Sequence, residues 1–147
     1  MSTTDSEQLR AIVAVSATDG VRVRTNIATV EPGQCDFAIT RGVGYPLRVI
    51  WFDDSETVVD LSAGTASFVV RKQPDSTTNI LALTQLTGVT LAAPEPNITV
   101  SLSAANVTTI IDGVTDGAVA ACWWLYVTVS SVTRCLLRGS IALREGN

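Results

Sequence analysis

The sequence predicts an all-β fold of two layers, a sandwich or a barrel, and three observations lead to this class. Short runs of β-branched and aromatic residues recur along the chain, and turn-forming residues separate them at intervals of roughly eight to twelve residues. No strands alternate with amphipathic helices, which disfavours a parallel nucleotide-binding sheet. The 147 residues are enough for one such domain and too few for two.

Near the N-terminus, two short apolar runs flank Asp19-Gly20. An Asp-Gly pair between alternating runs is a strong hairpin signal. In the second run Val21 and Val23 alternate with arginines, so one face is apolar and the other is charged. We therefore expect an N-terminal tail with a hairpin or arm over residues 1–33, followed by a β-sandwich domain over residues 34–147.

Further strands are expected between turn signals along the rest of the chain. The run over residues 118–130 is the strongest, because it contains the aromatic and β-branched segment AACWWLYVTVS. Residues 103–112 are the one segment expected to form a helical turn, with Ser103 as its N-cap. The other expected strands are apolar or alternating runs, and they span residues 35–40, 47–52, 65–72, 80–83, 88–91, 97–102, 132–137 and 139–143.

Composition and charge disfavour several classes of function. The chain has no histidine, which is the commonest general base and the commonest metal ligand. Its formal net charge is -4, whereas binding to a nucleic-acid backbone needs clustered positive charge. No apolar run approaches the roughly 20 residues of a membrane helix, and the polar N-terminus lacks the pattern of a signal peptide. We expect no enzymatic activity, no cofactor, and neither nucleic acid nor membrane as a partner.

The three cysteines are Cys35, Cys122 and Cys135. Their odd number and wide spacing make a poor disulfide framework and a poor zinc site. We interpret them as reduced thiols that pack as small apolar groups. Because Cys122 and Cys135 lie in apolar runs that could be adjacent strands, a pairing between these two stays open.

Two polar patterns could hold a ligand or a modification. Asp53, Asp54 and Glu56 form the tightest carboxylate group, which could bind Ca²⁺ through oxygen ligands. More often, Asp-Asp-Ser between two strands is a solvated turn, so we expect no metal site. The glycosylation pattern at Asn97 and Asn106 predicts nothing without a secretion signal.

Aromatic side chains are the best candidates for an interaction surface. Trp123 and Trp124 are adjacent, so in a strand they point to opposite faces. One can fill the core, and the other then lies outside or under a segment of the same chain or a neighbouring subunit. The candidate interface residues are Val21, Val23, Trp123 and Trp124. Stacked aromatic side chains could also bind sugars.

Several segments over residues 36–144 follow one another in a characteristic order: DFAITRG at 36–42, LRVIW at 47–51, TASFVVRK at 65–72, ITVSL at 98–102 and RCLLRG at 134–139. Taken together, they resemble the N-terminal domain of baseplate upper proteins, a domain common in virion proteins of tailed bacteriophages. The resemblance implies an immunoglobulin-like antiparallel β-sandwich and a structural role in a phage particle. It supplies no catalytic residues.

The resemblance further implies a homo-oligomer that contacts other virion proteins in the tail, baseplate or collar, after synthesis in the host bacterial cytoplasm. The chain departs from the family pattern by its extra N-terminal hairpin and by stopping at Asn147, where baseplate upper proteins continue into a coiled coil or a receptor-binding part. Two alternatives therefore stay open. One is a capsid decoration protein on the head, and the other is a carbohydrate- or receptor-binding module.

Overall fold

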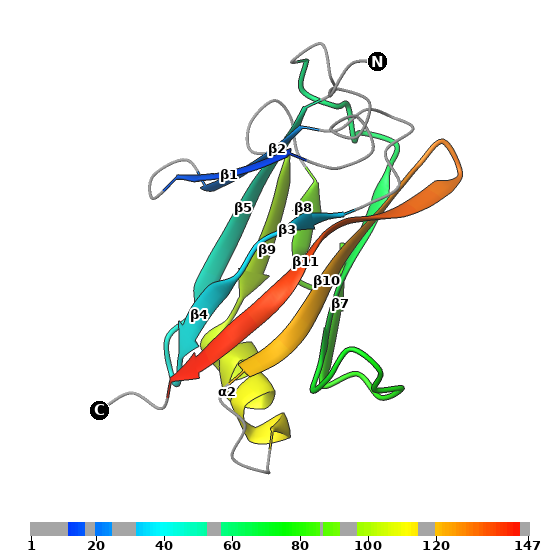
Figure 1. Cartoon of the computed structure of the whole chain (residues 1–147). Helices are drawn as coiled ribbons and strands as arrows, with labels where there is room; N and C mark the ends of the chain where they lie inside the picture. The colour runs from blue at the N-terminus through cyan, green and yellow to red at the C-terminus, as the bar shows by residue number, and fades with distance from the viewer. Residues whose placement is uncertain are drawn as a thin grey trace, which may run out of the picture.

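The computed structural model describes residues 12–16, 20–24, 32–52, 57–85, 87–91, 97–114 and 120–144 (Figure 1). These residues form two β-sheets and one helix, which lies at one end of the sheets. The expected all-β class is therefore confirmed. For the two N-terminal strands the description covers the backbone alone.

The first sheet contains, in spatial order, β1 (Ile12–Ser16), β2 (Gly20–Arg24), β5 (Tyr45–Phe52), β9 (Ile98–Leu102) and β8 (Val89–Leu91). β1 and β2 pair antiparallel on either side of residues 17–19, which confirms the expected hairpin. β2 pairs in parallel with β5, so the hairpin extends this sheet. The remaining neighbours are antiparallel.

The second sheet contains, in spatial order, β3 (Gly33–Gln34), β11 (Val132–Arg144), β10 (Ala120–Val129), β6 (Thr65–Arg71) and β7 (Leu81–Thr84), and β4 (Phe37–Thr40) also pairs with β11. β3 and β4 run parallel to β11, and the other neighbours are antiparallel. Between β3 and β4 the chain leaves the sheet edge at residues 35 and 36 and returns in the same register. The strand expected over residues 35–40 therefore begins only at Phe37, after this kink, and the short strand β3 precedes the kink.

The hairpin of β10 and β11 differs from the expectation in one respect. The two runs expected over residues 132–137 and 139–143 form one continuous strand, because a β-bulge opposite Leu125 and Tyr126 absorbs the change in register. The bulge allows two consecutive side chains, Leu136 and Leu137, to be buried at 1% and 0% exposure.

The helix α2 (Ala104–Gly113) follows β9 directly. Ser103 Oγ accepts a hydrogen bond from the Asn106 backbone N–H at 3.0 Å, and Asn106 Oδ1 accepts one from the Ser103 N–H at 3.0 Å. This reciprocal capping box confirms Ser103 as the N-cap. The helix matches the expected segment 103–112 to within one residue at each end and is longer than one turn. Val107, Ile110 and Ile111 form an apolar stripe that packs on the core.

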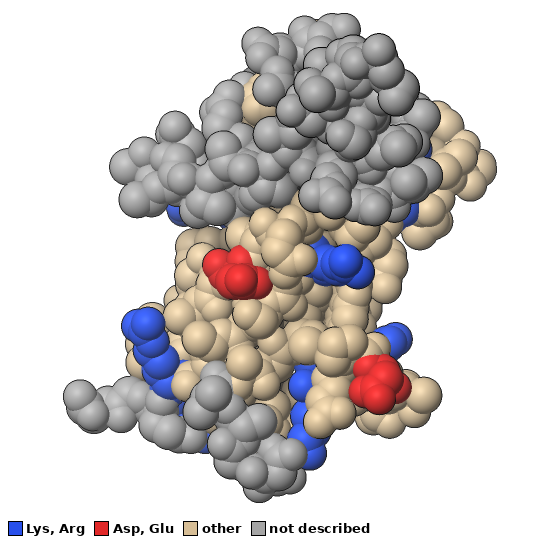
Figure 2. Space-filling view, in the orientation of Figure 1, with Lys and Arg blue, Asp and Glu red and all other residues tan. Residues whose placement is uncertain are grey.

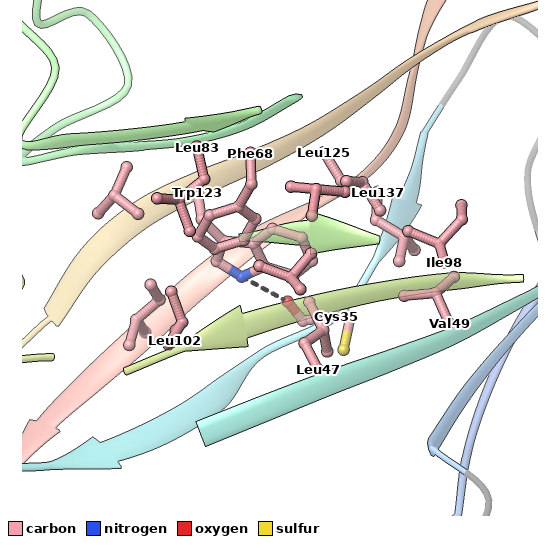
Figure 3. Close-up of a cluster of buried hydrophobic side chains, with 14 of the residues drawn as sticks. Cys35, Leu47, Val49, Phe68, Leu83, Ile98, Leu102, Trp123, Leu125 and Leu137 are labelled. Carbon is pink, nitrogen blue, oxygen red and sulfur yellow. Dashed lines mark hydrogen bonds between the residues drawn. The ribbon is translucent and has the colours of Figure 1, made fainter. Parts of the chain in front are cut away.

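Side chains from both sheets share one core (Figure 3). Trp123 and Phe68 lie at its centre, with ring centroids 5.5 Å apart and planes tilted by 31°. Full burial of an aliphatic or aromatic side chain of this kind stabilises a fold by about 1.5–3 kcal/mol. The residues that face one another across the layers include Leu47, Val49, Ile98, Leu102, Phe68, Trp123, Leu125 and Leu137.

Candidate functional site

The two adjacent tryptophans of β10 lie on opposite faces of the second sheet, as strand alternation predicts. Trp123 is 0% exposed and fills the core, whereas Trp124 is half-buried on the outer face. A fully enclosed side chain offers no surface to a partner, so Trp124 is the candidate of the pair that can contact one. Val21 and Val23 lie in β2, and their side chains lie outside the described residues.

The kink between β3 and β4 fixes the position of Trp123. The Cys35 carbonyl accepts a hydrogen bond from Trp123 Nε1 at 3.1 Å (Figure 3). It reaches the indole past Gly139, where an added Cβ would lie 1.6 Å from the Cys35 oxygen. On the outer side of the kink, Asp36 Oδ1 accepts the backbone N–H of Ser140 at 2.9 Å. The kink therefore satisfies a buried donor and also places a carboxylate on the outer face.

A shallow groove of about 350 Å³ lies on this outer face, beside Trp124. We call it the Trp124 groove. It brings together residues from β3, the kink, β10, β11 and the turn after β6, namely Gln34, Asp36, Pro74, Cys122, Trp123, Trp124, Arg138, Gly139 and Ser140. Segments that are a hundred residues apart in the sequence meet here because β3 pairs with β11.

The indole of Trp124 is supported from the side of β6. The Arg71 guanidinium carbon lies 5.5 Å from the ring centroid, within the range of a cation–π contact. Arg71 is itself oriented, because its Nε donates to Asn79 Oδ1 at 2.8 Å. Arg71 does not line the groove, so the indole is braced by β6 while it remains accessible from the side of β11.

The charges that line the groove are balanced. Asp36 contributes one carboxylate and Arg138 one guanidinium, and the other lining side chains are uncharged. Arg138 lies directly opposite Trp124 in the register of β10 and β11 and is exposed. On the face of the molecule drawn in Figure 2, the described surface is largely uncharged, with separate acidic and basic groups.

The three cysteines are free thiols. Cys122 lies opposite Ser140, and Cys135 lies opposite Tyr126. Cys122 and Tyr126 are thus four residues apart on β10, or about 13 Å, too far for a disulfide between the two cysteines. Burial raises the pKa of the Cys135 thiol to about 11, and it also raises the pKa of Cys35 and Cys122. These thiols are therefore protonated near neutral pH rather than activated as nucleophiles.

Asn97 is an important residue whose role the sequence did not indicate. Its side chain is 0% exposed. Its Oδ1 accepts the Trp51 backbone N–H at 2.8 Å, and its Nδ2 donates to the carbonyls of Trp51 at 3.2 Å and Val59 at 2.9 Å. Asn97 therefore joins the end of β5 to the segment around Val59. The glycosylation pattern at this position falls on an amide that is enclosed and fully bonded.

The three residues of the acidic turn, Asp53, Asp54 and Glu56, lie outside the described residues. Within the described ranges, no group of three or more His, Cys, Asp or Glu side chains could hold a metal ion. Over the same part of the chain, no helix has the length and apolar character needed to cross a membrane.

Comparison with known proteins finds no match to a protein-family model or to a curated protein. Sequence reasoning found Trp124 but missed Gln34, Asp36 and Arg138. These three are exposed polar residues without any local pattern, so only the pairing of β3 with β11 reveals that they belong together.

Proposed function

We propose that the protein is a non-catalytic structural component of a tailed-bacteriophage particle, and that it assembles as a homo-oligomer with other virion proteins in the tail, baseplate or collar. We further propose that its sandwich is immunoglobulin-like. The observation that carries the proposal is the order of strands in the two sheets, which agrees with the fold that the family resemblance implies.

The strand orders support the immunoglobulin-like assignment in detail. β2, β5, β9 and β8 follow the order A-B-E-D, and β11, β10, β6 and β7 follow the order G-F-C-C′. The helix α2 occupies the connection between the strands equivalent to E and F. The chain differs from the usual pattern at β2, which is parallel to β5.

The N-terminal hairpin offers a route to assembly. β1 pairs with β2 on one side and is the outermost strand of its sheet. The outer edge of such a strand presents backbone N–H and C=O groups that can pair with a strand of another chain. The candidate interface residues Val21 and Val23 lie in this same hairpin. A particle protein assembled in this way would follow the symmetry of its neighbours.

The experiment is a cryo-EM map of the particle of the phage that encodes this chain. Copies confined to the tail, baseplate or collar would support the proposal. Copies spread over the capsid lattice would favour the alternative, a decoration protein on the head. Absence from the particle would overturn the virion function altogether.

A deletion tests the role of the hairpin separately. Removing residues 1–30 should abolish incorporation into the particle, while the remaining domain should still unfold cooperatively. A thermal unfolding curve of the shortened chain provides the control for folding. If the shortened chain folds and is incorporated at the normal level, the hairpin is not the assembly contact.

A further inference from the structure

We propose that the Trp124 groove is a binding site for a neutral saccharide, formed where the indole of Trp124 meets the Asp36 carboxylate and the Arg138 guanidinium. This site is on the outer face of the second sheet, whereas the hairpin to which assembly is assigned belongs to the first sheet. The inference therefore does not rest on the proposed function, and either can fail without the other.

The size of the groove fits a small ligand. Its volume of about 350 Å³ lies at the lower end of the roughly 300–1,000 Å³ that small-molecule sites occupy. A stable protein partner would bury about 800 Å² on each side, which is far more surface than this groove offers. One or two sugar rings match the available space.

Trp124 provides the apolar surface that a sugar ring needs. Among the described tryptophans, Trp51 and Trp123 are 3% and 0% exposed, whereas Trp124 is half-buried and lines the groove. The C–H groups of a pyranose are weakly positive, and the face of an indole is weakly negative, so the two surfaces attract one another. Because Arg71 already braces the indole, little side-chain freedom is lost when a ligand stacks on it.

The polar side chains of the groove form a mixed set of donors and acceptors. The Arg138 guanidinium makes no hydrogen bond to any described residue and can donate. Gln34 Nε2 donates to Asp36 Oδ1 at 3.5 Å, and the Gln34 amide oxygen can accept. Asp36 uses Oδ1 to hold Ser140, which leaves Oδ2 able to accept. A sugar hydroxyl both donates and accepts, so a polyhydroxylated ring can satisfy both kinds of group at once.

The charge balance of the groove favours a neutral ligand. A phosphate, sulfate or carboxylate would gain a contact with Arg138 but would also lie close to the Asp36 carboxylate. The net charge of the chain, -4, adds to this repulsion. A cation would meet the opposite conflict with Arg138. A saccharide without ionised groups avoids both.

The test is a binding titration of the full chain with maltotriose, cellotriose and the trimer of N-acetylglucosamine, and heparin serves as the anionic probe. Trp124 is the most accessible of the three tryptophans, so its emission should change on binding, and calorimetry gives an independent affinity. We expect saturable binding of at least one neutral trimer. Trp124→Ala should weaken it by about tenfold or more, whereas Trp124→Phe, which keeps an aromatic face, should weaken it less.

Matched controls separate the groove from the rest of the surface. Tyr126 is the next aromatic on the same face of β10 and does not line the groove, so Tyr126→Ala should leave affinity unchanged. Arg138→Gln should weaken binding, whereas Arg48→Gln, on an exposed position of the first sheet, should not. The proposal is overturned if no neutral trimer binds up to about 10 mM, if only heparin binds, or if binding survives Trp124→Ala.

Discussion

Two residues that lie opposite each other in the hairpin of β10 and β11, Trp123 and Gly139, hold the kinked edge segment in place. The Trp123 indole N–H needs an acceptor because the side chain is 0% exposed, and the Cys35 carbonyl supplies it at 3.1 Å. Gly139 leaves the space through which that carbonyl approaches. The need for glycine here is steric, because no left-handed backbone conformation occurs at this position.

Gly139→Ala should therefore be strongly destabilising. An alanine Cβ would lie 1.6 Å from the Cys35 oxygen, and relief of this overlap would break the bond to Trp123. We expect the free energy of unfolding to fall by about 3 kcal/mol or more, measured by urea denaturation. Gly42→Ala is the control, because its φ is +82° but no atom lies within 4 Å of the added Cβ; it should lose only about 1 kcal/mol. Equal losses in the two variants would contradict the steric explanation.

Asn97 gives a second prediction at the residue scale. Asn97→Ala leaves the Trp51 N–H and the Val59 carbonyl without their partner and should lower the free energy of unfolding by about 2–4 kcal/mol. Asn97→Asp sets a carboxylate against two carbonyl oxygens. Burial raises the pKa of this new carboxyl above its unfolded value of about 3.9.

The sign of the pH effect follows from that raised pKa. Relative to the wild type, the Asn97→Asp variant should be least destabilised below about pH 4, and the difference should grow as the pH rises, because only the unfolded state then ionises freely. Asn97→Ala should show no such additional dependence. Denaturation of both variants at pH 4 and pH 7 provides the measurement, and parallel behaviour would contradict the buried position of the side chain.

At the scale of elements, the hairpin of β10 and β11 is the longest paired unit of the fold. Its turn consists of Ser130 and Ser131, both with positive φ, at 53° and 63°. This is the pattern of a type I′ turn, which matches the twist of the two strands but favours Asn and Gly over serine. The hydroxyls of Thr128 and Thr133 lie 2.7 Å apart beside the turn and add a cross-strand hydrogen bond.

Replacing the turn with its preferred residues should stabilise the protein. We expect the double variant Ser130→Asn, Ser131→Gly to raise the free energy of unfolding by about 1 kcal/mol, because left-handed backbone strain is removed. The double alanine variant retains the strain and should give no increase. Urea midpoints of the three proteins make the comparison. A lower midpoint for the Asn-Gly variant would argue against this turn geometry.

At the scale of the whole molecule, burial of thiols makes the stability of the folded protein depend on pH in the alkaline range. The pKa of Cys135 is raised to about 11, chiefly by burial, whereas an unfolded thiol titrates near 8.5. The contribution of Cys135 to stability should therefore be complete below about pH 8.5 and should be lost as the pH rises through about 11.

Cys135→Ala isolates this contribution from the other groups that titrate at high pH. Thermal unfolding between pH 8 and pH 11 should show a steeper loss of stability in the wild type than in the variant. Cys122→Ala serves as a comparison, because burial raises the pKa of that thiol as well. Identical slopes for the wild type and Cys135→Ala would show that this thiol is not protected from ionisation in the folded state.

The sequence alone determined the features that depend on neighbours within a few residues. Alternation of side chains across a strand placed Trp123 and Trp124 on opposite faces, Asp19-Gly20 indicated the first hairpin, and Ser103 marked the start of the helix. These features follow from φ and ψ preferences and from the two-residue period of a strand, so local patterns are sufficient to predict them.

Only the tertiary structure decided which distant segments meet. Backbone pairing uses the same N–H and C=O groups at every residue, so the sequence carried no sign that β2 lies beside β5 or that β3 lies beside β11. The partners of Asn97 and the lining of the Trp124 groove depend on those pairings. The class of the fold could thus be predicted from local sequence patterns. The candidate site, in contrast, depends on contacts between segments about one hundred residues apart, such as the hydrogen bond between Asp36 and Ser140.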